Sequence, residues 1–231
     1  MIVDAHAHIG DYSPVIPGGT HSAEELVERW DAARVDCGVI SVLGSDPEAA
    51  NDMTREACRR YPGRIFGYVY LNPTDVKGSL SELDRCRQHD CFRGVKFHPM
   101  NNAYYPFVED YYPVYARAEE LGLPMLWHSG TSPYSHPLQI AFVARSFPAV
   151  PFILGHFALS DLTWECFPAA ELAENVMVDT TANPIVPVMD DWIRRFGAER
   201  MLWGSDFPFY DVAYELVKVD HLAIEPDARR Q

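Results

Sequence analysis

Residues 37–73 read CGVISVLGSDPEAANDMTREACRRYPGRIFGYVYLNP, and this stretch carries the pattern that decides the fold. It begins with CGVISVLG and ends with IFGYVYLNP, two short runs rich in β-branched and aromatic residues, as is typical of buried strands. The segment between them has a helical pattern and stops near Gly63, since glycine commonly ends helices. The stretch therefore predicts a strand, a helix and a second strand.

The same alternation runs from one end of the chain to the other. The eight predicted strands are IVDAHAHI (2–9), CGVISVLG (37–44), IFGYVYLNP (65–73), FRGVKFHP (92–99), PMLWHSG (124–130), PFILGHF (151–157), VMVDTT (176–181) and MLWGSDFP (201–208). Eight strand–helix rounds in 231 residues, about 29 residues each, predict an α/β protein with a single-domain (β/α)8 TIM barrel over residues 1–231. A doubly wound open sheet is the alternative. It usually carries a glycine-rich phosphate turn, and the sequence has neither GxGxxG nor GxxxxGK[ST].

Two of the predicted helices have clear sequence signals. Ser22 with Glu25 three residues later forms a capping-box pattern, which predicts a helix start before the second strand. Before the eighth strand, apolar residues recur at the spacing of one helix face; they are Val188, Met189, Trp192, Ile193 and Phe196.

Composition narrows the class of protein. The formal net charge of −14 argues against a nucleic-acid or anionic-membrane partner, because either would call for a basic patch. No apolar run approaches the ~18 residues of a membrane span, and the start lacks the pattern of a signal peptide. The five cysteines are scattered without a CxxC pair and are expected to be reduced. We expect a cytoplasmic protein that acts on a small molecule.

Polar residues gather at the predicted carboxyl ends of the strands, where such barrels place their chemistry. These residues are His6 and His8 on strand one, Lys96 and His98 on strand four, His128 on strand five, His156 on strand six and Asp206 on strand eight. Residues two apart on a strand share a face, so the strand-one pair can bind one ion. Three imidazoles and a carboxylate, with no sulfur, favour Zn2+; Mn2+ or another divalent ion is the alternative.

Four motifs in this order resemble the amidohydrolase superfamily, specifically its branch related to aminocarboxymuconate-semialdehyde decarboxylase. They are DAHAHIG (4–10), WHSG (127–130), LGHF (154–157) and WGSDFP (203–208), and the resemblance runs from Met1 to about Val219. It implies that His6, His8, His128 and Asp206 bind the metal and that His156 is the general acid/base. The branch contains hydrolases, decarboxylases and hydratases, so the resemblance implies the site more closely than the reaction.

Two further residues keep alternative roles, and a third is expected to be structural. Lys96 either binds a substrate carboxylate as a free ammonium or, carboxylated by CO2 as in other amidohydrolases, bridges two metal ions. His98 shares its face and is a candidate for contact either with the substrate or with a metal ligand. Asp4 precedes the histidine pair, and we expect it to be hydrogen-bonded because an unpaired buried carboxylate is costly.

The function that these residues predict is metal-dependent hydrolysis of a small amide, lactone or ester through a metal-activated water, with Asp206 or His156 moving the proton. The alternative is non-oxidative decarboxylation of a small unsaturated or aromatic carboxylic acid. A Schiff-base aldolase using Lys96 and a non-catalytic metal-binding protein are less favoured. DARRQ (227–231) offers no apolar face where relatives continue with a helix, so the oligomeric state, for which a homodimer is one option, stays open.

Overall fold

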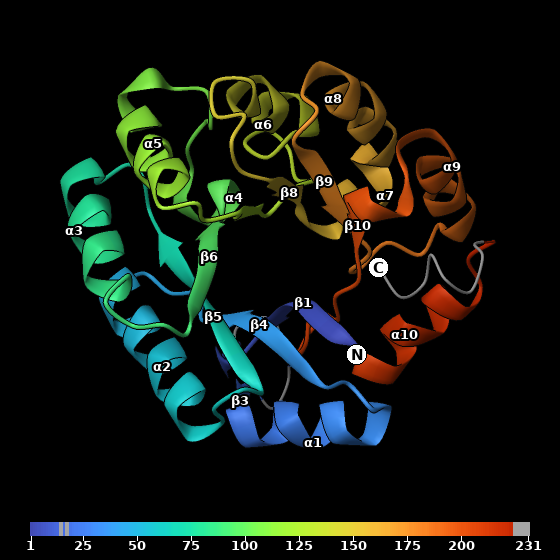
Figure 1. The fold of residues 1–231 in the computed structure, drawn as a ribbon, viewed down its shortest axis with the longest axis horizontal. Helices are drawn as coiled ribbons and strands as arrows, with labels where there is room; N and C mark the ends of the chain where they lie inside the picture. Colours follow the sequence, from blue (N-terminus) through green and yellow to red (C-terminus); the bar gives the residue numbers. More distant parts are fainter. Residues whose placement is uncertain (14–15, 17–18, 224–231) are drawn as a thin grey trace.

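The computed structural model describes residues 1–13, 16 and 19–223, and its main feature is a ring of parallel strands surrounded by helices (Figure 1). The eight strands follow one another around the ring in chain order. They are β1 (Val3–His8), β4 (Cys37–Ser41), β5 (Ile65–Leu71), β6 (Phe92–Phe97), β7 (Met125–Trp127), β8 (Phe152–Leu154), β9 (Val176–Asp179) and β10 (Met201–Leu202). Each lies inside one of the eight predicted runs, so the predicted TIM barrel is confirmed.

Helices follow every strand of the barrel and form its outer layer (Figure 1). The longer ones are α1 (Ala23–Ala33), α2 (Pro47–Arg60), α3 (Val76–Cys86), α5 (Tyr112–Glu120), α6 (Pro137–Ala144), α8 (Cys166–Leu172), α9 (Val186–Phe196) and α10 (Val212–Asp220). The short ones are α4 (Pro99–Asn102), α7 (Leu159–Leu162) and the 3-10 turns η1 (Glu109–Tyr111), η2 (Gly155–Ala158), η3 (Thr163–Glu165) and η4 (Ala198–Arg200). A small hairpin, β2 (Gly10–Asp11) with β3 (Thr20–His21), lies outside the barrel sheet.

Three backbone hydrogen bonds join the first strand of the ring to the segment that follows the last. The amide of Ala5 donates to the carbonyl of Trp203 (3.0 Å), that of Asp206 to His6 (2.7 Å) and that of His8 to Phe207 (2.6 Å). Because one of these bonds joins Asp206 to His6 and another involves His8, closing the barrel also brings the two ends of the predicted metal site together.

The core has two layers. Inside the barrel, Tyr68, Leu126 and Ile153 pack together at its base. Between the strands and the helices, Trp30, Trp127 and Trp192 are fully buried. Filling on both sides of the strands is what makes a barrel of this kind a packed core rather than a pore.

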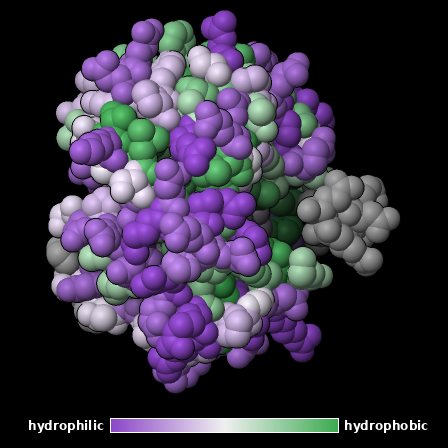
Figure 2. Space-filling view, turned by 60° about the vertical axis from the view of Figure 1, so that its left-hand side comes forward, coloured by the Kyte–Doolittle hydropathy of each residue, from purple (hydrophilic) through white to green (hydrophobic). Residues whose placement is uncertain are grey.

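The helices have the expected signals. Ser22 accepts a hydrogen bond from the amide of Glu25 (3.1 Å) at the start of α1, which confirms the predicted cap. The face of the molecule in Figure 2 is mostly hydrophilic, with hydrophobic side chains gathered in small separate areas. No helix in the described part of the chain is long and apolar enough to cross a membrane. The segment DARRQ lies outside the described residues.

Candidate metal centre

The predicted site residues lie together at the carboxyl ends of the strands. His6 and His8 lie at the end of β1 and Lys96 near the end of β6. The remaining four lie within four residues after the ends of their strands; they are His98, His128, His156 and Asp206. All are buried except His128, which is partly exposed. The seven residues that the sequence places at the carboxyl ends of the strands therefore form one cluster.

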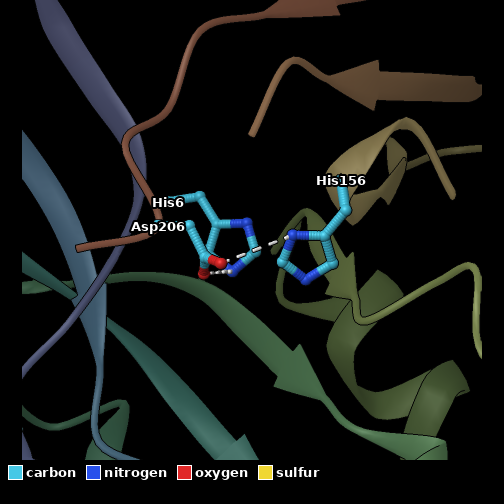
Figure 3. A group of neighbouring side chains, drawn as sticks. All are labelled: His6, His156 and Asp206. Carbon is cyan, nitrogen blue, oxygen red and sulfur yellow. Dashed lines mark ion pairs between the residues drawn. The ribbon is translucent and has the colours of Figure 1, made fainter. Parts of the chain in front are cut away.

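The centre of the cluster is a triangle of three donor atoms. His6 Nε2 lies 3.1 Å from His8 Nε2 and 3.7 Å from Asp206 Oδ1, and the latter lies 3.4 Å from His8 Nε2. His156 approaches from the other side, with Nδ1 3.8 Å from Asp206 Oδ2. Figure 3 shows the rings of His6 and His156 meeting at the Asp206 carboxylate, and one donor atom from each of these three residues lies within 4.8 Å of the others.

These spacings fit a divalent ion. Donors bound at about 2.0–2.2 Å in tetrahedral or octahedral arrangements lie roughly 3.0–3.6 Å from one another, close to the sides of this triangle. The hydrogen bonds of the rings agree, because a ligand nitrogen must carry a lone pair. His8 Nδ1 donates to the carbonyl of Ser41 (2.8 Å) and His6 Nδ1 to the Asp179 carboxylate (2.8 Å), which leaves both Nε2 atoms unprotonated.

The electrostatics of the cluster also suit a cation. Burial lowers the pKa of His6 and of His156 well below the usual range, helped by neighbouring positive groups, so both rings are neutral near pH 7 as ligands must be. Burial likewise lowers the pKa of Lys96 to about 8, against the opposing effect of Asp206 and Asp179. Burial raises the pKa of Asp206, partly offset by its hydrogen bond with His8. A bound cation would favour the charged form of this carboxylate.

His128 contacts His156 rather than the three donor atoms of the triangle. Its Nδ1 is 3.0 Å from His156 Nε2, its Nε2 is 2.9 Å from the hydroxyl of Thr131, and its ring is stacked on that of His98 at 4.0 Å between centroids. The structure thus brings His128 into the cluster through His156 rather than through the strand-one pair.

The two substrate-binding candidates differ in their contacts. Lys96 reaches the centre of the cluster, with Nζ 2.8 Å from His6 Nε2. His98 lies at the start of α4, where its Nδ1 accepts a hydrogen bond from the amide of Asn101 (3.2 Å). Its neutral ring therefore carries its proton on Nε2. Asp4 accepts hydrogen bonds from Trp30 Nε1 (2.9 Å) and from Ser205, as expected for a structural carboxylate.

The backbone of the site is strained where it turns the side chains inward. Asp206 has φ 54°, and the four residues 156–159 all have positive φ, between 44° and 66°. Such conformations cost non-glycine residues of the order of 1–2 kcal/mol each and concentrate at functional sites. Gly155 leaves room for this turn, since a Cβ there would lie 2.8 Å from the carbonyl oxygen of Trp127 and 3.3 Å from His6 Cε1.

Asp179 is a member of the cluster that the sequence analysis missed. It ends β9, is fully buried and contacts both His6 and the backbone of His156. The signal was present, because VMVDTT places a carboxylate at the end of the seventh predicted strand, where the rule applied to the other strands would have found it.

Aromatic side chains also lie beside the site. The ring of Phe209, which is 39% exposed, lies 6.2 Å from that of His8 and 5.1 Å from that of Tyr12. In the segment 101–115, Tyr104 is buried, while Tyr105 and Phe107 are exposed.

A family model described as Amidohydrolase matches residues 3–231. A gamma-resorcylate decarboxylase from Polaromonas sp. is 22% identical over 91% of this chain and 81% of that protein. A second, from Rhizobium radiobacter, is 23% identical over 71% of this chain and 65% of that protein. A 5-carboxyvanillate decarboxylase from Novosphingobium aromaticivorans, solved with manganese and 4-hydroxy-3-methoxy-5-nitrobenzoic acid, superposes with a TM-score of 0.81 at 14% identity, covering 100% of this chain and 92% of that one.

Proposed function

Because the chain belongs to the amidohydrolase family, we propose that it is a metal-dependent lyase that releases CO2 from a small aromatic or unsaturated carboxylic acid. The observation that carries the proposal is the similarity to aromatic-acid decarboxylases over most of the chain. It favours the decarboxylase alternative over hydrolysis of an amide, lactone or ester, which was the first interpretation of the sequence.

The buried donor triangle supports the metal dependence. His6, His8 and Asp206 would hold the ion, and His128 would join them if its ring turned away from His156. A bound divalent cation would neutralise a substrate carboxylate and stabilise the negative charge that develops on the substrate. Manganese, present in the similar 5-carboxyvanillate decarboxylase, and zinc, favoured by the donor types, are the two ions proposed.

Residues of the same cluster, Asp206 included, are proposed to bind the substrate and to move the proton. When the bond to the carboxyl group breaks, its electron pair stays on the substrate carbon, which must then gain one proton as CO2 leaves. His156 and Asp206 are the two groups proposed to carry that proton, because both are titratable and His156 Nδ1 lies 3.8 Å from Asp206 Oδ2 at the centre of the cluster. The Lys96 ammonium, buried beside His6, is proposed to attract the acidic substrate.

The test is product analysis with metal-loaded protein. Hydroxylated and methoxylated benzoates and unsaturated acids are incubated in D2O alongside lactones, esters and amides, with the His6→Ala variant as control. We expect CO2 and one deuterium on the carbon that lost it, with wild-type protein only. A product that keeps every carbon and gains the elements of water would replace the proposal with hydrolysis.

A further inference from the structure

Asp179 is the residue that both sides of the cluster share. Its side chain is completely buried and each oxygen has its own partners. Oδ2 lies 2.8 Å from His6 Nδ1. Oδ1 accepts from the amide of His156 (2.8 Å), and from the amide (3.1 Å) and the hydroxyl (2.6 Å) of Thr181. One oxygen therefore faces a proposed metal ligand and the other faces the segment that carries His156.

The Oδ2 contact determines the tautomer of His6. A carboxylate only accepts hydrogen bonds, so the neutral His6 ring must carry its proton on Nδ1. The lone pair is then on Nε2, the atom that lies 3.1 Å from His8 Nε2. Without the carboxylate, the His6 proton is free to move to Nε2, where it would block metal binding.

The Oδ1 contacts determine the tautomer of His156 through Thr181. The Thr181 hydroxyl donates its one proton to Asp179 Oδ1. Its oxygen must therefore accept the hydrogen bond from His156 Nδ1, which lies 2.8 Å away. The His156 proton is therefore on Nδ1, and its Nε2 accepts from His128 Nδ1 at 3.0 Å.

We infer that Asp179 is a positioning residue with two separable roles: Oδ2 sets His6 for metal binding, and Oδ1, through Thr181, sets the orientation and tautomer of His156. The inference rests on the proposed metal site. It assigns Asp179 no contact with the ion or the substrate. Carboxylates that orient ligand histidines typically change metal affinity by 10–100-fold when they are replaced.

The experiment uses Asp179→Asn and Thr181→Val, with Thr181→Ser as the conservative variant. Metal affinity for Mn2+ and Zn2+ is measured by competition with a chromophoric chelator, and histidine tautomers of the metal-free protein by 15N NMR. Glu82→Gln, which alters a buried carboxyl group on α3 away from the site, is the control for general destabilisation, and thermal melting checks folding of every variant.

We expect Asp179→Asn to bind metal 10–100-fold more weakly than wild type. Its 15N NMR spectrum should also lose the signal of a His6 ring protonated on Nδ1. Thr181→Val should change the His156 tautomer while its metal affinity stays within about 3-fold of wild type, and Thr181→Ser should restore the wild-type tautomer. Wild-type affinity in a folded Asp179→Asn protein overturns the inference, as does an unchanged His156 tautomer in Thr181→Val. A wild-type protein that binds neither ion would instead overturn the proposed metal site.

Discussion

His156 Nδ1 lies 3.8 Å from Asp206 Oδ2, but the other contacts of these two residues differ. Asp206 Oδ1 lies near the Nε2 atoms of both strand-one histidines, whereas the two ring nitrogens of His156 are engaged by Thr181 and His128. Because His156 is not one of the three residues of the donor triangle, we expect it to carry a proton rather than to hold the ion. Variants of these two residues therefore allow metal binding and proton transfer to be tested separately.

We expect His156→Asn to retain metal near the wild-type content but to lose roughly 10²–10⁴-fold in kcat, the usual contribution of a positioned proton carrier. Asp206→Ala should lose both metal and rate. Metal content by elemental analysis and kcat on the same preparations check this. A His156→Asn protein that is purified without metal would make His156 a ligand, as its closeness to His6 and Asp206 also permits.

At the scale of the element, α10 holds the segment that follows β9. Lys218 donates to the carbonyls of Thr180 (2.7 Å) and Asn183 (3.0 Å) and pairs with Glu215 at 2.5 Å, and both side chains of this ion pair are buried. Burial raises the pKa of Glu215 to about 7, partly offset by Lys218. The helix that follows the last strand thus contains a carboxyl group whose pKa lies near neutral pH.

The Glu215 shift predicts how stability depends on pH. A carboxyl group whose pKa is higher in the folded than in the unfolded protein contributes stability that is fully present below about pH 4.5 and is lost as pH rises through about 7. The free energy of unfolding of wild type minus that of Glu215→Gln should therefore fall between pH 5 and pH 8, by about 1–3 kcal/mol.

Urea unfolding at several pH values measures this difference, with the exposed Glu28→Gln of α1 as the control that should show no such trend. A difference that stays constant, or grows with pH, contradicts the raised pKa of Glu215.

At the scale of the whole molecule, the proposed metal site spans the junction between the first and last strands. His6 and Asp206 are 200 residues apart in the chain, and the hydrogen bond between the Asp206 amide and the His6 carbonyl helps to close the ring. An ion bound by both would add a link across the same junction. Metal binding and barrel stability are therefore expected to be coupled.

We expect free Mn2+ or Zn2+ at 100 times its Kd to stabilise the protein by about 2.7 kcal/mol and to raise Tm by about 5–10 °C. Thermal melting with and without chelator measures the shift, and His6→Ala should melt at one temperature under both conditions. An equal shift in wild type and His6→Ala would place the stabilising ion elsewhere.

The sequence by itself determined the barrel and the residues at its mouth. Strand and helix periodicities depend on neighbours a few residues away, so runs such as IFGYVYLNP and the Ser22 cap were predictable. Because parallel strands all end on one side of a barrel, His6, His8 and Asp206 were also predictable as neighbours. Their roles as ligands, and those of His128, Lys96 and His98, stay predictions.

Only the tertiary structure decided which atoms face one another. It directs His128 to His156, brings the missed Asp179 between His6 and His156, and gives Asp206 a φ of 54° that few sequence patterns signal. These outcomes depend on strand tilt, on hydrogen bonds between segments more than 20 residues apart and on tolerated backbone strain, none of which is local to the residues concerned. A side chain that moves by about an ångström can change its hydrogen-bond partner, whereas the periodicity of apolar residues in the sequence is unaffected by such shifts.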